Sequence, residues 1–350
     1  MKKIIASLML VAMICNLSAC GYRKEQRYEA SFLNLFDTVT KIVGYAKSKE
    51  EFADYAQMIH DELEKYHQLY DIYNNYEGIN NIKTINDNAG VAPVKVDKEI
   101  IDLLLLSKEA YELSHGKKNI AFGSVLTLWH QYRTEGIDNP DNAALPPMEE
   151  LVARKEHTDI NDVIIDEQAS TVYLQDPQMS LDVGAIAKGY ATERVSKYIE
   201  AQGFKHGMLS VGGNVRTIGS KLEGKTKDEF WSVGIQNPDL ESEEKTIYIL
   251  NLKDFSLVTS GVYERYYTVD GQRYHHIIDP DTLMPSNNYQ SVSVVCRDSG
   301  MADALTTIIF NMSQEEGLKL IESLGDTEAL WVMNDGSMKY SDGFEAFIKE

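Results

Sequence analysis

Residues 259–280 concentrate the side chains of this sequence that are best suited to chemistry. Tyrosines, arginines, histidines and carboxylates stand close together here around two turn signals, Asp270-Gly271 and Asp279-Pro280. A core strand needs neither such turns nor such charges, so the pattern favours a site, and its aromatic and guanidinium faces suit a flat heterocycle. His276 is the natural proton-transfer group near neutral pH. His276 and Asp279 can face one pocket, or they can flank a turn around a structural histidine.

A second candidate site is predicted on a helix that opens near residue 299. Asp303 and Thr307 are four residues apart and therefore project from the same face of that helix. A carboxylate and a hydroxyl are hard oxygen ligands, which magnesium accepts together with water and substrate phosphates, whereas zinc favours His or Cys. The alternative is that Asp303 only stabilises the helix start through the helix dipole.

Two glycine-containing turns are candidates for phosphate binding. Residues 180–190 predict a strand, a turn of small residues and a helix start, where backbone N–H groups favour anions and Lys188 adds a cation. A tight strand-to-helix connection explains these glycines equally well. Gly212-Gly213-Asn214 follows a short strand and suits either a phosphate-facing loop or an ordinary turn.

The N-terminus has the pattern of a secretory leader. Lys2 and Lys3 precede an apolar run that is too short to span a bilayer, and Leu17-Ser18-Ala19-Cys20 is typical of a lipoprotein cleavage site. We expect residues 1–19 to be removed and Cys20 to carry lipid, which would anchor the chain to the cell membrane on its extracytoplasmic side. The alternative is a plain signal peptide beside a chance cysteine.

The composition restricts the partners. The formal net charge is −20, and loss of the leader would remove two lysines and no acid. Nucleic acid and anionic lipid headgroups are therefore poor partners, and an acidic protein that binds a phosphate-bearing ligand needs local cations or a metal. Cys296 would be the only remaining thiol, which excludes a disulfide framework within the chain, and we expect it in a buried strand.

Local patterns predict an α+β fold with mixed, largely antiparallel sheets and packed helices. A capping box at Ser48 predicts a helix over 48–70, and a second helix is expected over 97–116. Strands are predicted over 163–165, 171–174 and 291–295. We expect residues 20–30 to form a tether and residues 31–350 to form one functional domain of two subdomains.

The candidate motifs occur in a fixed order. They are Leu-Asp-x-Gly-x-Ile-Ala-Lys-Gly-Tyr-Ala from Leu181, Gly-Gly-Asn from Gly212, Thr-Ser-Gly-x-Tyr-Glu-Arg from Thr259, His-x-Ile-Asp-Pro from His276, and Ala-Asp-Ala-Leu-x-Thr from Ala302. Together with the lipoprotein leader, this order resembles the ApbE family of FAD:protein FMN transferases. The resemblance is dense from about residue 180 to residue 312 and sparser before it.

The resemblance implies a magnesium-dependent enzyme that cleaves the pyrophosphate of FAD, releases AMP and attaches FMN to a threonine of another exported flavoprotein. Asp303 and Thr307 would hold the metal through their side chains, and Ala185 through its carbonyl. His276 would transfer the proton of the acceptor hydroxyl, directly or assisted by Asp279. The residues implied to contact FAD are Phe36, Tyr73, Asn119, Ile120, Ala121, Asp182, Lys188 and Ile278.

The chain departs from the family pattern at three places. Phe36-Asp37-Thr38 stands where the family usually has Met-Gly-Thr, and Lys118-Asn119-Ile120-Ala121 stands where it has Phe-Asp-Pro-Thr. Leu283 occupies a position where a turn glycine is common. The motifs for the metal and the pyrophosphate are intact.

Acceptor sites in the family have the form Asp/Ser-Gly-x-Thr. This chain contains near misses such as Ser260-Gly261 and Ser299-Gly300, but none is followed by threonine at the required position. We therefore expect transfer to a separate protein and no self-modification. Two other functions stay open: an FAD hydrolase that uses water in place of threonine, and a lipoprotein that binds FAD without chemistry.

Overall fold

An eight-stranded antiparallel sheet forms the centre of the described part of the chain. The computed structural model describes residues 24–222 and 229–349; the expected leader and Cys20 lie outside these ranges. Neighbouring strands in the sheet follow the order β1-β2-β6-β7-β10-β13-β14-β15. The strands are β1 (Gln26–Leu35), β2 (Thr38–Ala46), β6 (Gly207–Val211), β7 (Asn214–Ile218), β10 (Ser256–Gly261), β13 (Tyr289–Cys296), β14 (Glu328–Met333) and β15 (Met338–Tyr340).

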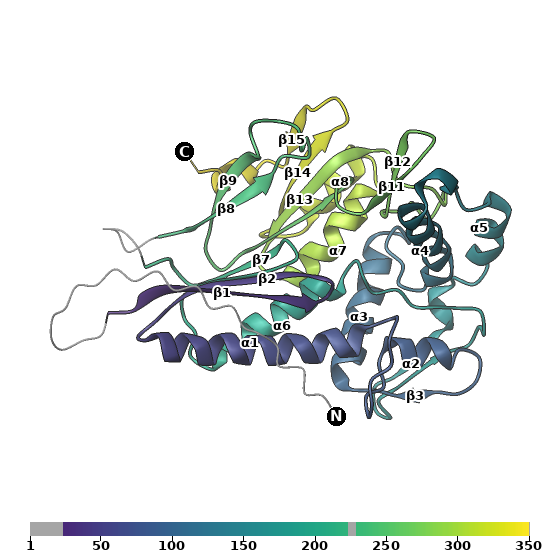
Figure 1. Ribbon diagram of the computed structural model, residues 1–350, viewed down its shortest axis with the longest axis horizontal. Helices are drawn as coiled ribbons and strands as arrows, with labels where there is room; N and C mark the ends of the chain where they lie inside the picture. The colour runs from purple at the N-terminus through teal and green to yellow at the C-terminus, as the bar shows by residue number, and fades with distance from the viewer. Residues whose placement is uncertain (1–23, 223–228, 350) are drawn as a thin grey trace.

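Helices cover one face of this sheet (Figure 1). They are α1 (Lys49–Tyr70), α6 (Ala187–Ala201), α7 (Ser299–Phe310) and α8 (Gln314–Ser323). Successive side chains along each strand point to opposite faces of the sheet. On β13, for example, Val292 and Val294 pack into the core under the helices, whereas Val295 belongs to a second core on the opposite face.

The second core is closed by the hairpin of β8 (Trp231–Gln236) and β9 (Thr246–Leu252). Trp231, Val233 and Ile235 alternate along β8 and are buried against the large sheet, while the residues between them are exposed. Gly234 and Gln236, two of the exposed residues of β8, line the cleft described below.

A smaller group of elements packs beside the sheet and the helices (Figure 1). It consists of α2 (Ile82–Asp87), α3 (Lys98–Leu113), α4 (Gly123–Asp138), α5 (Met148–Lys155), the sheet of β3 (Val94–Lys95), β5 (Thr171–Leu174) and β4 (Val163–Asp166), and the hairpin of β11 (Tyr266–Val269) and β12 (Gln272–His275). A third hydrophobic core joins α4 to the β11–β12 hairpin through Trp129 and Tyr267. Short 3₁₀ helices lie at Pro140–Asn142, Ile160–Asp162 and Phe344–Phe347.

The predicted α+β class is confirmed, and most local predictions agree with the observed elements. The strand expected to begin at residue 180 is wrong, because Ser180 forms only an isolated bridge with Phe122. Ser48 caps α1 by accepting a hydrogen bond from the Glu51 N–H at 3.2 Å, although Glu51 reaches back to Lys47 N and not to Ser48 N. The Gly116 N–H bonds to the Tyr111 carbonyl just beyond α3, as expected at a helix end. The hairpin of β4 and β5, strand β13 and the buried Cys296 also match the predictions.

The predicted tether of residues 20–30 is too long at its C-terminal end. Strand β1 begins at Gln26 and pairs with β2 along its whole length, so residues 26–30 belong to the fold. Tyr28 stacks on Phe52 of α1 with ring centroids 5.5 Å apart, and Ala30 is buried. The polar composition of this segment reflects an edge strand with one exposed face.

Among the helices that the structure describes, none combines the length and the apolar character that crossing a bilayer requires.

Candidate active site

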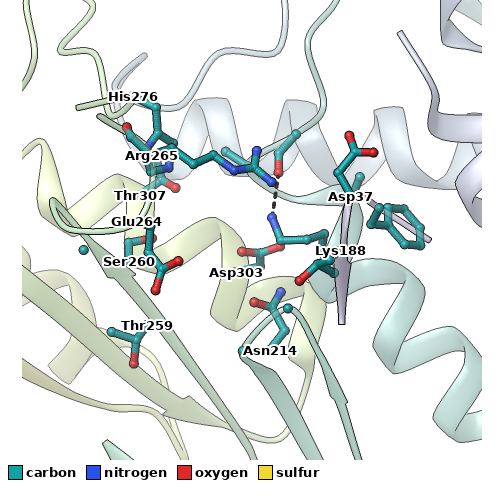
Figure 2. A pocket seen from close by; sticks show the side chains of 18 of the residues that line it. Asp37, Lys188, Asn214, Thr259, Ser260, Glu264, Arg265, His276, Asp303 and Thr307 are labelled. Carbon is teal, nitrogen blue, oxygen red and sulfur yellow. Dashed lines mark hydrogen bonds between the residues drawn. The ribbon is translucent and has the colours of Figure 1, made fainter. Parts of the chain in front are cut away.

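A cleft of about 930 Å³ lies where α4, α6 and α7 meet the turns of the large sheet. Figure 2 shows Lys188 and Asp303 in the middle of this cleft, with His276, Arg265 and Thr307 to one side and Asp37 to the other. Lys41, Arg133, Lys188 and Arg265 all line it. The cleft of this acidic protein therefore carries the local cations that a phosphate-bearing ligand requires.

Helix α7 presents the two predicted metal ligands to the cleft. Asp298 caps the helix by accepting hydrogen bonds from the N–H groups of Gly300 and Met301. Asp303 and Thr307, one turn apart, then both line the cleft. The buried carboxylate of Glu193 on α6 accepts a further bond from Ser299 N at 2.9 Å, which ties the start of α7 to its neighbour.

The turn before α6 faces the same space. One oxygen of Asp303 accepts a hydrogen bond of 2.8 Å from the Gly189 N–H in the first turn of α6. A Cβ atom at Gly189 would stand 2.4 Å from the Asp303 Cβ and 2.3 Å from the Ser299 carbonyl oxygen. Glycine is thus required here because the two helices approach closely. The Lys188 Nζ donates a hydrogen bond of 3.4 Å to the Gly184 carbonyl oxygen.

Two hairpin turns close another side of the cleft. The turn between β1 and β2 places Phe36 and Asp37 at φ +53° and +52°, and both residues line the cleft. The turn between β6 and β7 lies against it, since a Cβ at Gly212 would stand 2.8 Å from Thr38 Oγ1. Glycine adopts such left-handed φ values without steric cost, whereas Phe36 and Asp37 adopt them with side chains.

Asn214 is a site residue that the sequence analysis did not single out by itself. Its side chain is buried and lines the cleft, and its Nδ2 has no hydrogen-bond partner within the described residues. A buried donor without a partner is costly, so this amide is well suited to donate to an acceptor on a ligand. The sequence feature that could have identified Asn214 is its place in the Gly-Gly-Asn motif.

His276 has a geometry that suits proton abstraction. Its Nδ1 lies 3.3 Å from the Arg265 carbonyl oxygen, which can only accept, so Nδ1 carries the hydrogen. Burial, followed by the charges of Arg265, His275, Arg133 and Lys188, lowers the pKa of His276 well below 6.5. The neutral ring therefore leaves Nε2 unprotonated. His275 is different: its Nε2 bonds to the Ser286 carbonyl and its Nδ1 accepts from Ile277 N, which indicates a structural role.

Helix α4 contributes two titratable cleft residues that the sequence analysis missed, His130 and Arg133. His130 lies with its Nδ1 3.1 Å from the Tyr73 hydroxyl and its Nε2 3.8 Å from the Asp182 carboxylate. Burial lowers the pKa of Arg133, and the positive charge of Arg265 lowers it further. Their spacing on the helix is indistinguishable from that of ordinary surface residues, so only the tertiary structure reveals them.

The structure brings together most of the predicted site residues, but not all. Those that line the cleft are Phe36, Tyr73, Asp182, Ala185, Lys188, His276, Asp303 and Thr307. Asp279 is not part of the lining; it lies 3.3 Å from Lys117 Nζ and accepts from the Asp281 N–H. Ile278 is buried in the core next to α4. Asn119, Ile120 and Ala121 are also absent from the cleft lining.

The segment 119–121 is bonded to residues 180–182, which lead into the cleft. The Ile120 carbonyl accepts a hydrogen bond of 2.8 Å from the Asp182 N–H, and Ser180 bridges to Phe122. Ile120 and Ala121 are buried, and the Asn119 side chain bonds to Thr158 O and Ala121 N. These contacts hold the chain that leads to Asp182.

The oxygen donors of this cleft fit a magnesium ion. Asp303 and Thr307 offer a carboxylate and a hydroxyl from one helix face, and Ala185 lines the same cleft. The set contains hard oxygen ligands and no thiolate, which is the chemistry that magnesium prefers. The Ala185 carbonyl oxygen is also contacted by the ammonium of buried Lys118 at 2.9 Å.

Comparisons with known proteins agree with this architecture. The model of the ApbE family matches residues 36–331. A protein of Treponema pallidum (strain Nichols) named FAD:protein FMN transferase is 30% identical over 348 residues, which cover 95% of this chain and 92% of the relative. A protein of the same name from Klebsiella pneumoniae (strain 342) is 35% identical over 252 residues, covering 72% of this chain and 74% of the relative.

Solved structures support the same fold. The crystal structure of the ApbE protein from Thermotoga maritima superimposes with a TM-score of 0.79 at 30% sequence identity, covering 93% of this chain and 100% of that one. The flavin transferase ApbE from Vibrio cholerae matches with a TM-score of 0.75 at 23% identity, a level that supports the fold alone.

Proposed function

Because the chain belongs to the ApbE family and is an FAD:protein FMN transferase like its curated relatives, we propose that it attaches FMN through phosphate to a threonine of another exported protein and releases AMP. The observation that carries this proposal is the convergence of Asp303, Thr307, Lys188 and His276 on one cleft. The cleft thus combines metal ligands, cations and a neutral base.

Asp303, Thr307 and the carbonyl of Ala185 would hold magnesium. When bound, the metal would neutralise charge on the FAD pyrophosphate and stabilise the leaving AMP. The Gly189 N–H fixes the Asp303 carboxylate, so the acid needs no rearrangement to meet a cation. Preorganised groups of this kind are the ones that favour a charged transition state.

The cationic side chains bind and orient the phosphates of FAD. Figure 2 shows Lys188 beside Asp303 in the cleft, which is also lined by Arg265 and by Arg133 of α4. They supply positive charge from two directions in a protein whose formal net charge is −20. These positive charges attract the anionic substrate locally, although the protein as a whole is negatively charged.

His276 accepts the proton in the transfer step. Its Nε2 takes the hydrogen of the acceptor threonine hydroxyl, whose oxygen attacks the phosphorus of the FMN half of FAD. The new bond joins threonine oxygen to phosphorus, and the bond from that phosphorus to the oxygen bridging to AMP breaks. Asp279, which pairs with Lys117, supports the turn that carries the histidine.

The acceptor is proposed to be a separate exported flavoprotein with an Asp/Ser-Gly-x-Thr site, since this chain has no such sequence. Lipid on Cys20 would hold the enzyme at the outer side of the cell membrane, where such acceptors lie. Membrane fractionation of cells that carry Cys20→Ala tests this: the variant should move to the soluble fraction, and retention in the membrane would contradict the anchor.

The activity is tested by incubation with FAD, magnesium and a purified acceptor that carries the motif. We expect AMP release and covalent flavin on the acceptor threonine, both lost in Asp303→Ala and His276→Ala. Asp141→Ala, which removes an exposed acid in the 3₁₀ helix after α4 and outside the cleft lining, serves as the matched control and should retain both signals.

Each alternative function gives a different result in this assay. AMP release without an acceptor adduct would indicate an FAD hydrolase. FAD that stays intact after long incubation would indicate a protein that only binds the flavin. A covalent flavin on the enzyme incubated alone would contradict transfer to a separate protein.

A further inference from the structure

Lys118 is a buried cation that the proposed reaction does not yet use. Its Nζ donates a hydrogen bond of 2.9 Å to the carbonyl oxygen of Ala185, the proposed metal ligand. Lys118 is only 5% exposed to solvent, and its backbone N–H donates a hydrogen bond of 2.9 Å to the Ser114 hydroxyl. Lys118 belongs to the segment that follows α3, and its side chain reaches Ala185 without lining the cleft itself.

The electrostatic neighbours of Lys118 are the acids of the same site. Burial lowers the pKa of Lys118 to about 8; the charges of Asp303 and Asp182 raise it, and the charge of Lys188 lowers it further. A buried carboxylate without a counter-charge is costly, and Asp303 is itself buried. The Lys118 ammonium therefore supplies compensating charge within the protein.

We propose that Lys118 sets the metal affinity of the site. Its ammonium holds the Ala185 carbonyl and balances Asp303 and Asp182 in the metal-free enzyme, so that a divalent ion enters a site that already carries a positive charge. A carbonyl oxygen has two lone pairs and can contact both cations, but the two like charges repel at close range. This inference rests on the metal site of the proposed function.

Two neutral variants separate the charge of Lys118 from its hydrogen bond. Lys118→Gln retains a donor that can reach toward Ala185, and Lys118→Met retains only the length of the side chain. Mn²⁺ binding to each full-length protein is measured by electron paramagnetic resonance at one pH. We expect both variants to bind Mn²⁺ about tenfold more tightly than the wild type, because a nearby like charge has been removed.

Two further proteins calibrate the measurement. Lys117→Met removes a neighbouring charge that pairs with Asp279 and Asp281, and its Mn²⁺ affinity should equal that of the wild type. Asp303→Ala should lose Mn²⁺ binding. Retained binding in Asp303→Ala would place the metal elsewhere and so refute the proposed metal site itself, independently of the result at Lys118.

The stability of the metal-free proteins gives a second readout. Because Lys118 compensates the buried acids, both neutral variants should have a lower melting temperature without metal and a larger rise on adding Mn²⁺. Unchanged or weaker Mn²⁺ binding in folded neutral variants would overturn the proposal. Failure of both variants to fold even with Mn²⁺ present would also overturn it, since Lys118 would then be a structural residue only.

Discussion

The Asp303 carboxylate accepts a 2.8 Å hydrogen bond from the backbone N–H of Gly189. This contact joins α7 to the first turn of α6 and fixes the proposed metal ligand in the cleft. It also explains a glycine of the Lys-Gly-Tyr motif by packing, because any side chain at this position would collide with the residues of α7.

Gly189→Ala should therefore disturb the metal site. The added methyl group must push α6 and α7 apart, which we expect to destabilise the protein by about 1–3 kcal/mol and to weaken Mn²⁺ binding and FMN transfer together. Thermal unfolding and Mn²⁺ titration measure the two effects. Gly325→Ala, where nothing lies within 4 Å of the added Cβ, is the control. Normal Mn²⁺ affinity in Gly189→Ala would show that the contact does not position Asp303.

Glu193 connects three elements behind the cleft, and its removal should be costly. It is buried, lies 3.1 Å from Arg216 Nε on β7, and accepts from Ser299 N at the start of α7. Glu193→Gln leaves the buried Arg216 without its counter-charge, which we expect to lower the free energy of unfolding by about 3 kcal/mol in urea denaturation. Glu315→Gln on α8, which breaks an exposed pair with Lys319, should have no measurable effect. Equal stability of the two variants would refute this role.

Asn214→Ala should separate ligand binding from stability. The Asn214 Nδ2 is buried without a partner among the described residues, so its loss should not weaken the folded protein. A hydrogen bond to a charged acceptor contributes about 1.5–3 kcal/mol, and FAD affinity should therefore fall by about tenfold or more. Isothermal titration with FAD and a thermal melt provide the two values. Unchanged FAD affinity would remove Asn214 from the site.

The pH profile of transfer should report the lowered pKa of His276. Burial is the main cause, and the charges of Arg265, His275, Arg133 and Lys188 add to it. A lowered pKa keeps the imidazole neutral from neutral pH into the mildly acidic range, so kcat/KM should stay level there and fall only as the pH drops through that pKa.

Arg265→Gln removes one of these charges and should raise the pKa of His276 toward its ordinary value. The acidic limb of kcat/KM should accordingly move to higher pH, whatever happens to the maximal rate. Arg297→Gln, which removes an exposed arginine paired with Asp326, should leave the limb in place. An acidic limb that does not move in Arg265→Gln would argue against His276 as the base.

Local sequence patterns predicted those parts of the fold that depend on neighbouring residues. The start of α1 follows from the Ser48 cap, and the pairing of Asp303 with Thr307 follows from the period of a helix. His130 and Arg133 could not be predicted in the same way. They reach the cleft only because α4 packs against the β11–β12 hairpin through Trp129 and Tyr267.

Positions that depart from the family pattern show what local reasoning leaves out. Leu283 stands where a glycine is common and has φ +62°, which costs about 1–2 kcal/mol for a residue with a side chain. Its side chain is buried next to α4, and its carbonyl accepts from Trp129 Nε1 at 3.0 Å. Burial of the leucine offsets the strained backbone, and this balance is visible only in three dimensions.

The most direct test of the account is the position of a divalent ion in crystals soaked with Mn²⁺ and FAD. Anomalous scattering should place the ion between the Asp303 carboxylate, the Thr307 hydroxyl and the Ala185 carbonyl, in contact with the FAD pyrophosphate. An ion bound elsewhere, or FAD bound outside this cleft, would contradict the proposed mechanism.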